Sequence, residues 1–205
     1  INASYVDDLS EIGQIQFATQ ARRFKIYDPR PINISTFYNH KTFSGFIESQ
    51  YIPKTTSYFG ISRSEVLPLF NYAFAPNDRL YQNFNLTTAQ FAIQWNPFSG
   101  YMQTSTGRLE IEKRFPKFSL QLTKSFNNII GSDFDFTKVD FKIIHEIPYL
   151  SGQNTAFLFQ SGYAVGDTPL THLYSIAPNN LNRETLFQRI TFAGKNSFET
   201  MFFNE

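Results

Sequence analysis

The sequence predicts an all-β fold of antiparallel strands, and three observations lead to this prediction. From about residue 80 onward, segments in which apolar and polar residues alternate are separated by turn-like segments rich in Pro, Gly and Asn. Phe, Tyr and Trp together make up 18% of the 205 residues, and aromatic side chains favour strands. Convincing helical periodicity is missing over the same region, which argues against a helical or mixed fold.

The alternation is clearest between Lys138 and Ile147. Successive side chains of a strand point to opposite faces, so one face of this segment is charged and the other is apolar apart from His145. The charged face carries Lys138, Asp140, Lys142 and Glu146, and the apolar face carries Val139, Phe141, Ile143 and Ile147. We therefore predict a strand between a polar and an apolar environment.

A second polar ladder runs from Thr104 to Arg114. Its polar face carries Thr104, Thr106, Arg108, Glu110, Glu112 and Arg114, and its other face carries Leu109 and Ile111. Pro116 interrupts this strand, because proline cannot donate a hydrogen bond to the ladder. A further strand is predicted after it, in which polar residues alternate with Phe118, Leu120 and Leu122.

The segment from Asn83 to Trp95 is also predicted to be extended, but its apolar face changes along its length. The apolar residues are first Phe84 and Leu86 and later Phe91, Ile93 and Trp95. Such a change of face predicts a bulge or two shorter strands.

Another strand carries large side chains on one face and mostly small ones on the other. The large face has Phe157, Phe159, Tyr163 and Val165, and the other face includes Gly162 and Ala164. A small face is expected where a strand passes a crowded lumen or an inserted loop.

Both ends of the chain are predicted to be cut. The chain begins with Ile1 and no signal peptide precedes it, while residues 201–205 end within a predicted strand. Residues 1–40, which include 20–25 and 28–31, are predicted to be a loop or a poorly defined segment. The polar interval from Asp167 to Asn196 is predicted to be a long loop.

The composition excludes several classes of protein. A net charge of +1 and a pI near 8.1 provide no strong field for nucleic acid. Without cysteine there is no disulfide framework and no thiolate metal site. Charged residues reach only 17%, against about 25% in soluble domains. No apolar run approaches the roughly 18 residues of a transmembrane helix, whereas a barrel strand needs only about 9–11.

The sequence offers no convincing catalytic or cofactor site, so we expect that the protein is not an enzyme and binds no cofactor. Asp133, Asp135 and Thr137 have the spacing of a dehalogenase-like phosphatase loop, but the downstream acidic magnesium pair and the alternating strands and helices are absent. A turn capped by Asp explains this segment better. The three histidines, His40, His145 and His172, lack metal-ligand spacing.

Periodicity alone leaves two folds open. A soluble β-sandwich also alternates, with its charged face in water, and the ladder at Arg108–Arg114 fits a solvated sheet face. In a membrane barrel the same charges would face the lumen, because a charged side chain at the bilayer midplane costs about 2–4 kcal/mol.

Several short segments of the sequence resemble a Bacteroidota outer-membrane family in which a carboxypeptidase-regulatory-like domain precedes an uncharacterised β-barrel. They cover about residues 40–205 and lie at 58–65, 68–73, 114–122, 134–141, 162–170 and 198–205. This family is itself similar to the assembly-factor superfamily of barrels, which insert or export outer-membrane proteins. There, a long loop after a strand folds back into the lumen and carries an Arg-Gly-aromatic tip. Residues 192–195 replace that tip here with Phe-Ala-Gly-Lys.

The resemblance implies an incomplete antiparallel transmembrane β-barrel over residues 41–205, in a bacterial outer membrane, with a structural or complex-forming role. Its lumen would be lined by charges at Arg108, Glu110, Glu112, Arg114, Lys138, Asp140 and Lys142. Lipid would contact Leu109, Ile111, Phe118, Leu120, Leu122, Val139, Phe141, Ile143, Phe157 and Phe159.

The expected partners are membrane lipid, including the lipopolysaccharide leaflet, and other outer-membrane or periplasmic proteins, but no nucleic acid. Two alternatives remain open. The first is a role in protein insertion, protein export or solute transport. The second is a soluble β-sandwich that binds a ligand such as a glycan.

Overall fold

The computed structural model of the chain describes residues 2–11, 17–19, 37–69, 72, 80–105, 107–150, 154–175 and 197–198. Strands make up most of these residues, and none of the described residues lies in an α-helix. The prediction of an all-β fold is therefore confirmed.

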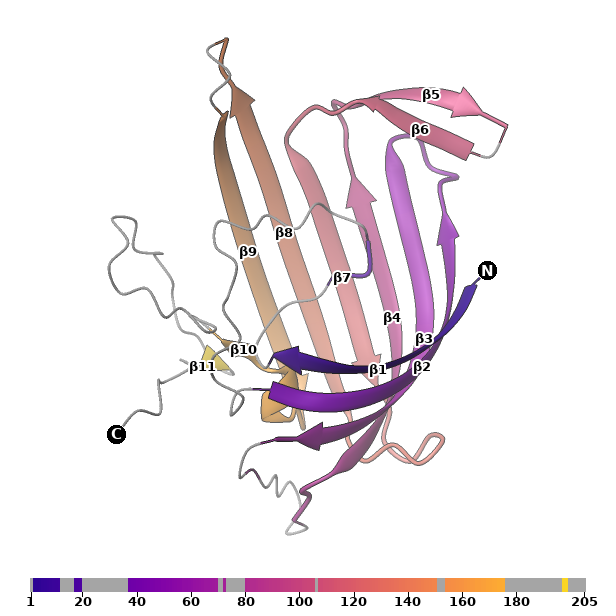
Figure 1. Cartoon of the computed structure of the whole chain (residues 1–205), viewed down its shortest axis with the longest axis vertical. Helices are drawn as coiled ribbons and strands as arrows, with labels where there is room; N and C mark the ends of the chain where they lie inside the picture. Colours follow the sequence, from indigo (N-terminus) through magenta and orange to yellow (C-terminus); the bar gives the residue numbers. More distant parts are fainter. Residues whose placement is uncertain are drawn as a thin grey trace.

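Seven strands form one antiparallel sheet in the order β1-β2-β3-β4-β7-β8-β9. They are β1 (Asn2–Glu11), β2 (Phe37–Ser49), β3 (Thr55–Pro68), β4 (Phe84–Trp95), β7 (Lys117–Ser125), β8 (Phe136–Pro148) and β9 (Asn154–Gly166). The sheet curves like part of a cylinder wall (Figure 1). Among the described residues it does not close, so β1 and β9 are its two edges.

Smaller elements lie beside this sheet. Between β4 and β7 the chain forms a separate hairpin of β5 (Gly100–Thr104) and β6 (Gly107–Glu112). After β9 come a short 3-10 helix, η2 (Leu170–His172), and β10 (Tyr174–Ser175), which pairs in parallel with β11 (Ser197–Phe198). The hairpin and η2 lie near opposite ends of the sheet (Figure 1).

The structure corrects the prediction of a loop over residues 1–40, because Asn2–Glu11 is a full strand that pairs with β2 at ten positions. The alternation of β1 is hidden in the sequence: Val6 shares a face with serines, whereas Asp7 shares the opposite face with Tyr5 and Leu9. The predicted surface segments at 20–25 and 28–31 lie outside the described residues. So do residues 176–196 of the predicted long loop and the terminal segment 201–205.

The strand β4 is continuous, so the predicted bulge or break is wrong. Its register with β3 and with β7 runs without a shift. Phe84 and Leu86 point to the concave side of the sheet, whereas Phe91 and Trp95 point to the convex side. The apolar face changes because the surroundings of the concave side change along the strand.

A buried apolar cluster fills the concave side at the end of the sheet where β4 and β8 begin. It comprises Tyr38, Val66, Phe84, Leu86, Phe134 and Phe136, with Tyr72 and Tyr81 packed against it. The Phe134 ring, from the turn between β7 and β8, packs edge-on against two other rings. Its centroid lies 5.2 Å from that of Phe84 and 5.0 Å from that of Tyr81. Aromatic rings prefer this geometry, and the cluster stabilises one end of the curved sheet.

Candidate functional site

The two sides of the seven-stranded sheet differ sharply in chemistry. We call the concave side the inner face. We call a set of thirteen large, exposed apolar residues on the convex side, named in the next paragraph, the outer belt. On the inner face, polar side chains are buried, including Asp140 at 1% and Lys138 at 8% exposure. A water-soluble sheet has the reverse arrangement, with its apolar face buried and its polar face in water.

The outer belt consists of large apolar residues, each between 38% and 63% exposed. Its members are Phe43, Ile47, Phe59, Ile61, Phe91, Trp95, Leu120, Leu122, Val139, Phe157, Phe159, Tyr163 and Val165. Register places six of them in one row across β2, β3, β4, β7, β8 and β9. This row, which contains no charged residue, is Ile47, Phe59, Phe91, Leu122, Val139 and Tyr163.

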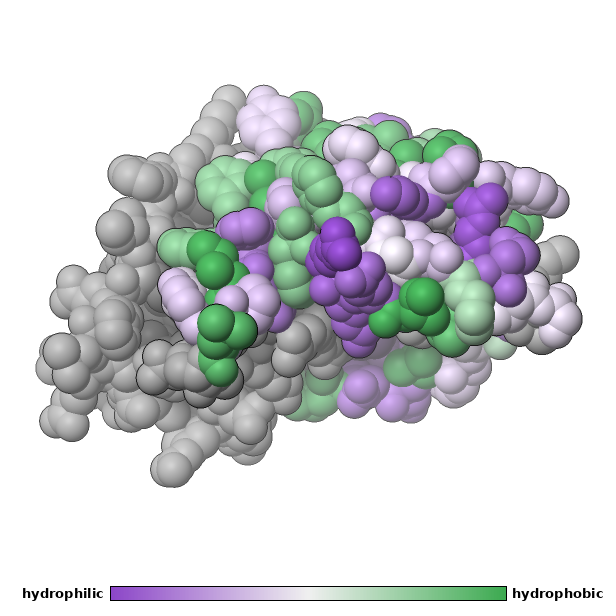
Figure 2. Space-filling model, turned by 90° about the horizontal axis from the view of Figure 1, so that it is seen from above, coloured by the Kyte–Doolittle hydropathy of each residue, from purple (hydrophilic) through white to green (hydrophobic). Residues whose placement is uncertain are grey.

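A row of three charged residues and one asparagine bounds the outer belt on one side. Asp7, Lys41, Glu65 and Asn85 occupy opposed positions on β1 to β4, on the convex side and toward the end with the apolar cluster. At the other end the belt finishes near the β5–β6 hairpin. Figure 2 shows the molecule from that end, where hydrophilic residues interrupt the hydrophobic ones.

The inner face carries a row of hydroxyl groups on the N-terminal half of the sheet. Ser4, Ser44, Ser62, Thr88 and Ser125 occupy opposed positions on five neighbouring strands. The hydroxyls of Ser4 and Ser44 lie 2.8 Å apart, as do those of Ser62 and Thr88. Hydrogen bonds between side chains therefore satisfy part of this polar surface without a partner molecule.

On β8, three charged residues follow one another on the inner face: Lys138, Asp140 and Lys142. The hydroxyl of Tyr174, in β10, donates a hydrogen bond to Oδ1 of Asp140 over 2.5 Å. The Lys138 ammonium lies 4.7 Å from the centre of the Tyr174 ring, within the range of a cation–π contact. The segment after β9 thus folds back onto the inner face.

Gly162, opposite Asp140 in the register of β8 and β9, provides room for this contact. A Cβ atom at Gly162 would collide with the Tyr174 ring. The small face of this strand was predicted to pass a crowded lumen or an inserted loop, and at this position the Tyr174 segment packs against it.

Residues 17–19 approach the same part of the inner face. The backbone N–H of Ala18 donates a hydrogen bond to Oε1 of Gln121 over 2.8 Å. The Lys142 ammonium lies 4.1 Å from the centre of the Phe17 ring. Gln121 is directly opposite Asp140, so two distant segments of the chain meet one row of the sheet.

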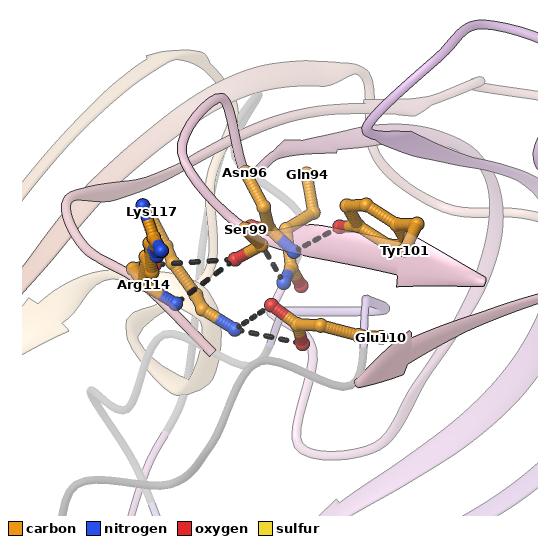
Figure 3. A network of polar contacts seen from close by, with 7 residues as sticks. All are labelled: Gln94, Asn96, Ser99, Tyr101, Glu110, Arg114 and Lys117. Atoms are coloured by element: carbon orange, nitrogen blue, oxygen red, sulfur yellow. Dashed lines mark hydrogen bonds and ion pairs between the residues drawn. The ribbon is translucent and has the colours of Figure 1, made fainter. Parts of the chain in front are cut away.

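A polar network ties the β5–β6 hairpin to the adjacent ends of β4 and β7 (Figure 3). Lys117 Nζ lies 2.6 Å from Oε1 of Glu110, and the amide of Asn96 donates to the Tyr101 hydroxyl over 3.0 Å. The Ser99 hydroxyl accepts from the Arg114 N–H and donates to the Arg114 carbonyl, each over 3.2 Å. The hairpin is therefore anchored through its polar side.

The predicted lumen residues fall into two groups in the structure. Lys138, Asp140 and Lys142 all lie on the inner face. In contrast, β6 of the separate hairpin carries Arg108, Glu110 and Glu112, and Arg114 follows it. Because β4 pairs directly with β7, the hairpin between them has no place in the main sheet, and its charges do not share the inner face.

The predicted lipid-facing residues divide in the same way. Eight of them lie on the convex side of the main sheet: Phe118, Leu120, Leu122, Val139, Phe141, Ile143, Phe157 and Phe159. Leu109 and Ile111 lie on the hairpin and are exposed there. The sequence did not single out Gln121, Tyr174 or residues 17–19, and only the small face around Gly162 signalled that a segment would pack nearby.

Within the described ranges, no group of three or more His, Asp or Glu side chains could hold a metal ion. The rings of His40 and His172 both lie beside the Tyr38 ring, whereas His145 stacks on Phe157. His40 also bonds to Ser10 and Thr42, and His172 belongs to η2. In the turn after β7, a carboxylate oxygen of Asp133 accepts the Asn85 N–H over 2.7 Å, and Asp135 pairs with Lys124. These aspartates therefore have structural partners.

Two groups of the segment after β9 are held neutral. Burial lowers the pKa of His172 to about 3, and the nearby charges of Lys138 and His40 act in the same direction. Burial raises the pKa of the Tyr174 hydroxyl, and the Asp140 carboxylate raises it further. Tyr174 is therefore a hydrogen-bond donor to Asp140 at neutral pH.

In the part of the chain that the structure describes, no helix has the length and hydropathy needed to cross a membrane. Comparison with protein families gives a match over residues 33–165 to a family of unknown function (DUF5686), C-terminal domain. No curated protein and no solved structure gives a significant match.

Proposed function

Since the chain belongs to the DUF5686 C-terminal domain family, whose function is unknown, we propose a function from its surface: it forms part of an antiparallel β-barrel that spans a bacterial outer membrane. The role we propose is structural or complex-forming, without catalysis. The family resemblance of the sequence to Bacteroidota outer-membrane barrels agrees with this proposal.

The observation that carries the proposal is the uninterrupted row of six exposed apolar residues from Ile47 to Tyr163. Large apolar side chains exposed to water are unfavourable, by about 25 cal/mol per Å² of apolar surface. Contiguous exposed apolar surface therefore marks contact with a protein or a membrane. Barrel strands in membranes face lipid with one of their two sets of alternating residues, and the other set is polar.

Length and backbone bonding also fit a membrane. The strands β2, β3, β8 and β9 have 13 or 14 residues, more than the roughly 9–11 that a tilted barrel strand needs. In lipid, every backbone N–H and C=O must be paired, which a closed barrel achieves. The proposal therefore requires further strands to pair with the edges β1 and β9.

The soluble β-sandwich is the weaker alternative. A sandwich buries the apolar face of each sheet against a second sheet. Among the described residues, no second sheet covers the outer belt, and the two-stranded sheets are too small to do so. Moreover, the face that a sandwich would leave in water is here buried and contacts other segments of the chain.

A cysteine scan tests the proposal, since the chain has no cysteine. An environment-sensitive fluorophore on Leu120→Cys should be quenched by spin-labelled lipid tails when the full-length protein is reconstituted in liposomes. The same fluorophore on the neighbouring Ser119→Cys, which points to the inner face, should not be quenched. Equal quenching at the two positions, or none at either, contradicts a membrane-spanning sheet.

A role in protein insertion, protein export or solute transport is the second candidate. The polar inner face favours it, because a lumen that conducts polar molecules must be polar. However, residues 17–19 and the segment that contains Tyr174 occupy part of that face. Whether the lumen is open therefore depends on these two segments.

A further inference from the structure

The connection between β1 and β2 reaches the inner face far from the strands that it joins. Residues 17–19 contact β7 and β8, and two other strands, β3 and β4, separate β7 from β2. Figure 1 shows this short segment in front of β7, on the concave side. A direct link between β1 and β2 would not require the chain to cross the sheet.

Two side chains of the sheet hold the segment. Gln121 accepts the Ala18 N–H, and Lys142 covers the Phe17 ring. Thr19, the next residue, is only 5% exposed. A backbone hydrogen bond, a cation–π contact and burial together fix three consecutive residues on the inner face.

The Tyr174 segment occupies the neighbouring positions of the same strands. On β8, Lys138 and Lys142 each cover one aromatic ring, Tyr174 and Phe17 respectively, with Asp140 between them. The two inserted segments are therefore bound by the same kind of contact, side by side along β8.

We propose that residues 17–19 are an internal plug, held in the lumen by Gln121 and Lys142. The proposal rests on the barrel function proposed above, because only a closed barrel turns the inner face into a lumen. It adds that the chain itself occupies this lumen next to Tyr174, so that the barrel is not an open solute pore in this state.

A disulfide tests the position of the plug. In the full-length protein with no other cysteine, reconstituted in liposomes, Ala18→Cys and Gln121→Cys should form a disulfide under mild oxidation. The substitution removes the hydrogen bond from Ala18 to Gln121, but Lys142 still covers the Phe17 ring and keeps the segment at this position. The bond links residues 103 positions apart, so the denatured chain should migrate faster on a non-reducing gel. The control pair is Ala18→Cys with Leu120→Cys, whose second cysteine lies on the outer belt. We expect at least a tenfold lower yield from the control pair, and equal yields overturn the proposal.

A second arm tests the clamp on Phe17. Lys142→Met, added to the Ala18 and Gln121 cysteine pair, should lower the rate of disulfide formation several-fold. Lys124→Met is the matched control, because Lys124 lies on the convex side and pairs with Asp135. An unchanged rate with Lys142→Met overturns the role of this lysine. Lipid quenching at Leu120→Cys together with no disulfide in the first pair contradicts the plug and leaves the membrane proposal standing.

Discussion

A carboxylate such as Asp140 can be buried in the sheet only because its neighbours compensate its charge. Removing a charge from water costs several kcal/mol unless it is paired and hydrogen-bonded. Lys138, two residues away on the same face, provides the opposite charge, and Tyr174 donates a hydrogen bond over 2.5 Å. The same three residues also determine where the segment after β9 can lie. At this scale, the inner face is a set of specific partners rather than a generally polar wall.

The glycine opposite Asp140 offers a sharp test of this arrangement. Gly162→Ala adds a Cβ atom into the Tyr174 ring, so we expect the folded state to lose about 1–3 kcal/mol, as for other overpacked sites. Urea unfolding of the full-length protein in detergent or liposomes measures this loss.

The control for this substitution is Gly45→Ala on β2. A Cβ atom at Gly45 meets nothing within 4 Å, so its effect should stay within about 0.5 kcal/mol. Adding Tyr174→Ala to Gly162→Ala should recover part of the lost stability, because the colliding ring is gone. If the stability losses of the two substitutions are simply additive, Gly162 does not make room for the Tyr174 ring.

The β5–β6 hairpin shows how an element outside the sheet is held by polar contacts. Its ion pair between Glu110 and Lys117 is mostly buried, with side chains 20% and 14% exposed. The neighbouring pair of Glu112 and Arg114 is 58% and 59% exposed. Exposed ion pairs contribute little, because water screens them, so the first pair should dominate the docking of the hairpin.

Substitution of the two glutamates separates these contributions. Glu110→Gln should weaken docking by about 1.5–3 kcal/mol, the range for a hydrogen bond to a charged group, and Glu112→Gln by less than about 0.5 kcal/mol. Amide hydrogen exchange within residues 100–112 measures docking directly. Comparable protection in both variants would show that the Glu110 pair does not anchor the hairpin.

Sequence reasoning identified strands with regular alternation, such as β8, and failed where the surroundings of one face change. Phe84 and Leu86 belong to the inner face, which is apolar at the start of β4 and polar further along the strand. The apolar residues therefore change face along one continuous strand, and this change was interpreted as a bulge or a break. β1 was missed because its alternation is irregular. Val6 lies on the polar face of the strand, and Asp7 lies on the apolar face. The charges from Arg108 to Arg114 were assigned to the lumen because alternation does not indicate which strands pair.

The docking of the segment after β9 on the inner face should depend on pH, because His172 of the short helix η2 is buried there. His172 is buried and neutral, with its pKa lowered to about 3 by burial and by the charges of Lys138 and His40. When the segment leaves, the imidazole regains its ordinary pKa near 6.5 and takes up a proton at lower pH. Docking is therefore most stable above about pH 6.5 and weakens by about 1.4 kcal/mol per pH unit as the pH falls from there toward 3.

Hydrogen exchange of residues 170–175 between pH 7.5 and 5 can measure this dependence, after correction for the intrinsic exchange rate. His172→Phe retains an aromatic ring beside Phe136 and Tyr38 but has no proton to gain. Its docking should be nearly constant over this pH range. A pH dependence equal to that of the wild type would assign the effect to another group.

At the scale of the whole molecule, the arrangement of the two faces determines which solvent the protein fits. A sheet with buried charges on one side and exposed aromatic and aliphatic residues on the other is unfavourable in water. The same sheet is favourable when lipid replaces water outside and the chain fills the inside. From the alternation of the sequence alone, either the polar or the apolar face could have been the inner one. The curvature of the sheet and its strand order show that the polar face is inside.

An arginine placed on the outer belt distinguishes the two solvents. Leu122 is 44% exposed in the middle of the apolar row. In lipid, Leu122→Arg should cost about 2–4 kcal/mol, the cost of an arginine at the midplane of a membrane barrel, whereas in water an exposed substitution should stay within about 0.5 kcal/mol. Asp7→Arg, in the charged row that bounds the belt, should be nearly neutral in either case. Folding free energies in liposomes provide the measurement, and a near-zero cost for Leu122→Arg would place the outer belt in water.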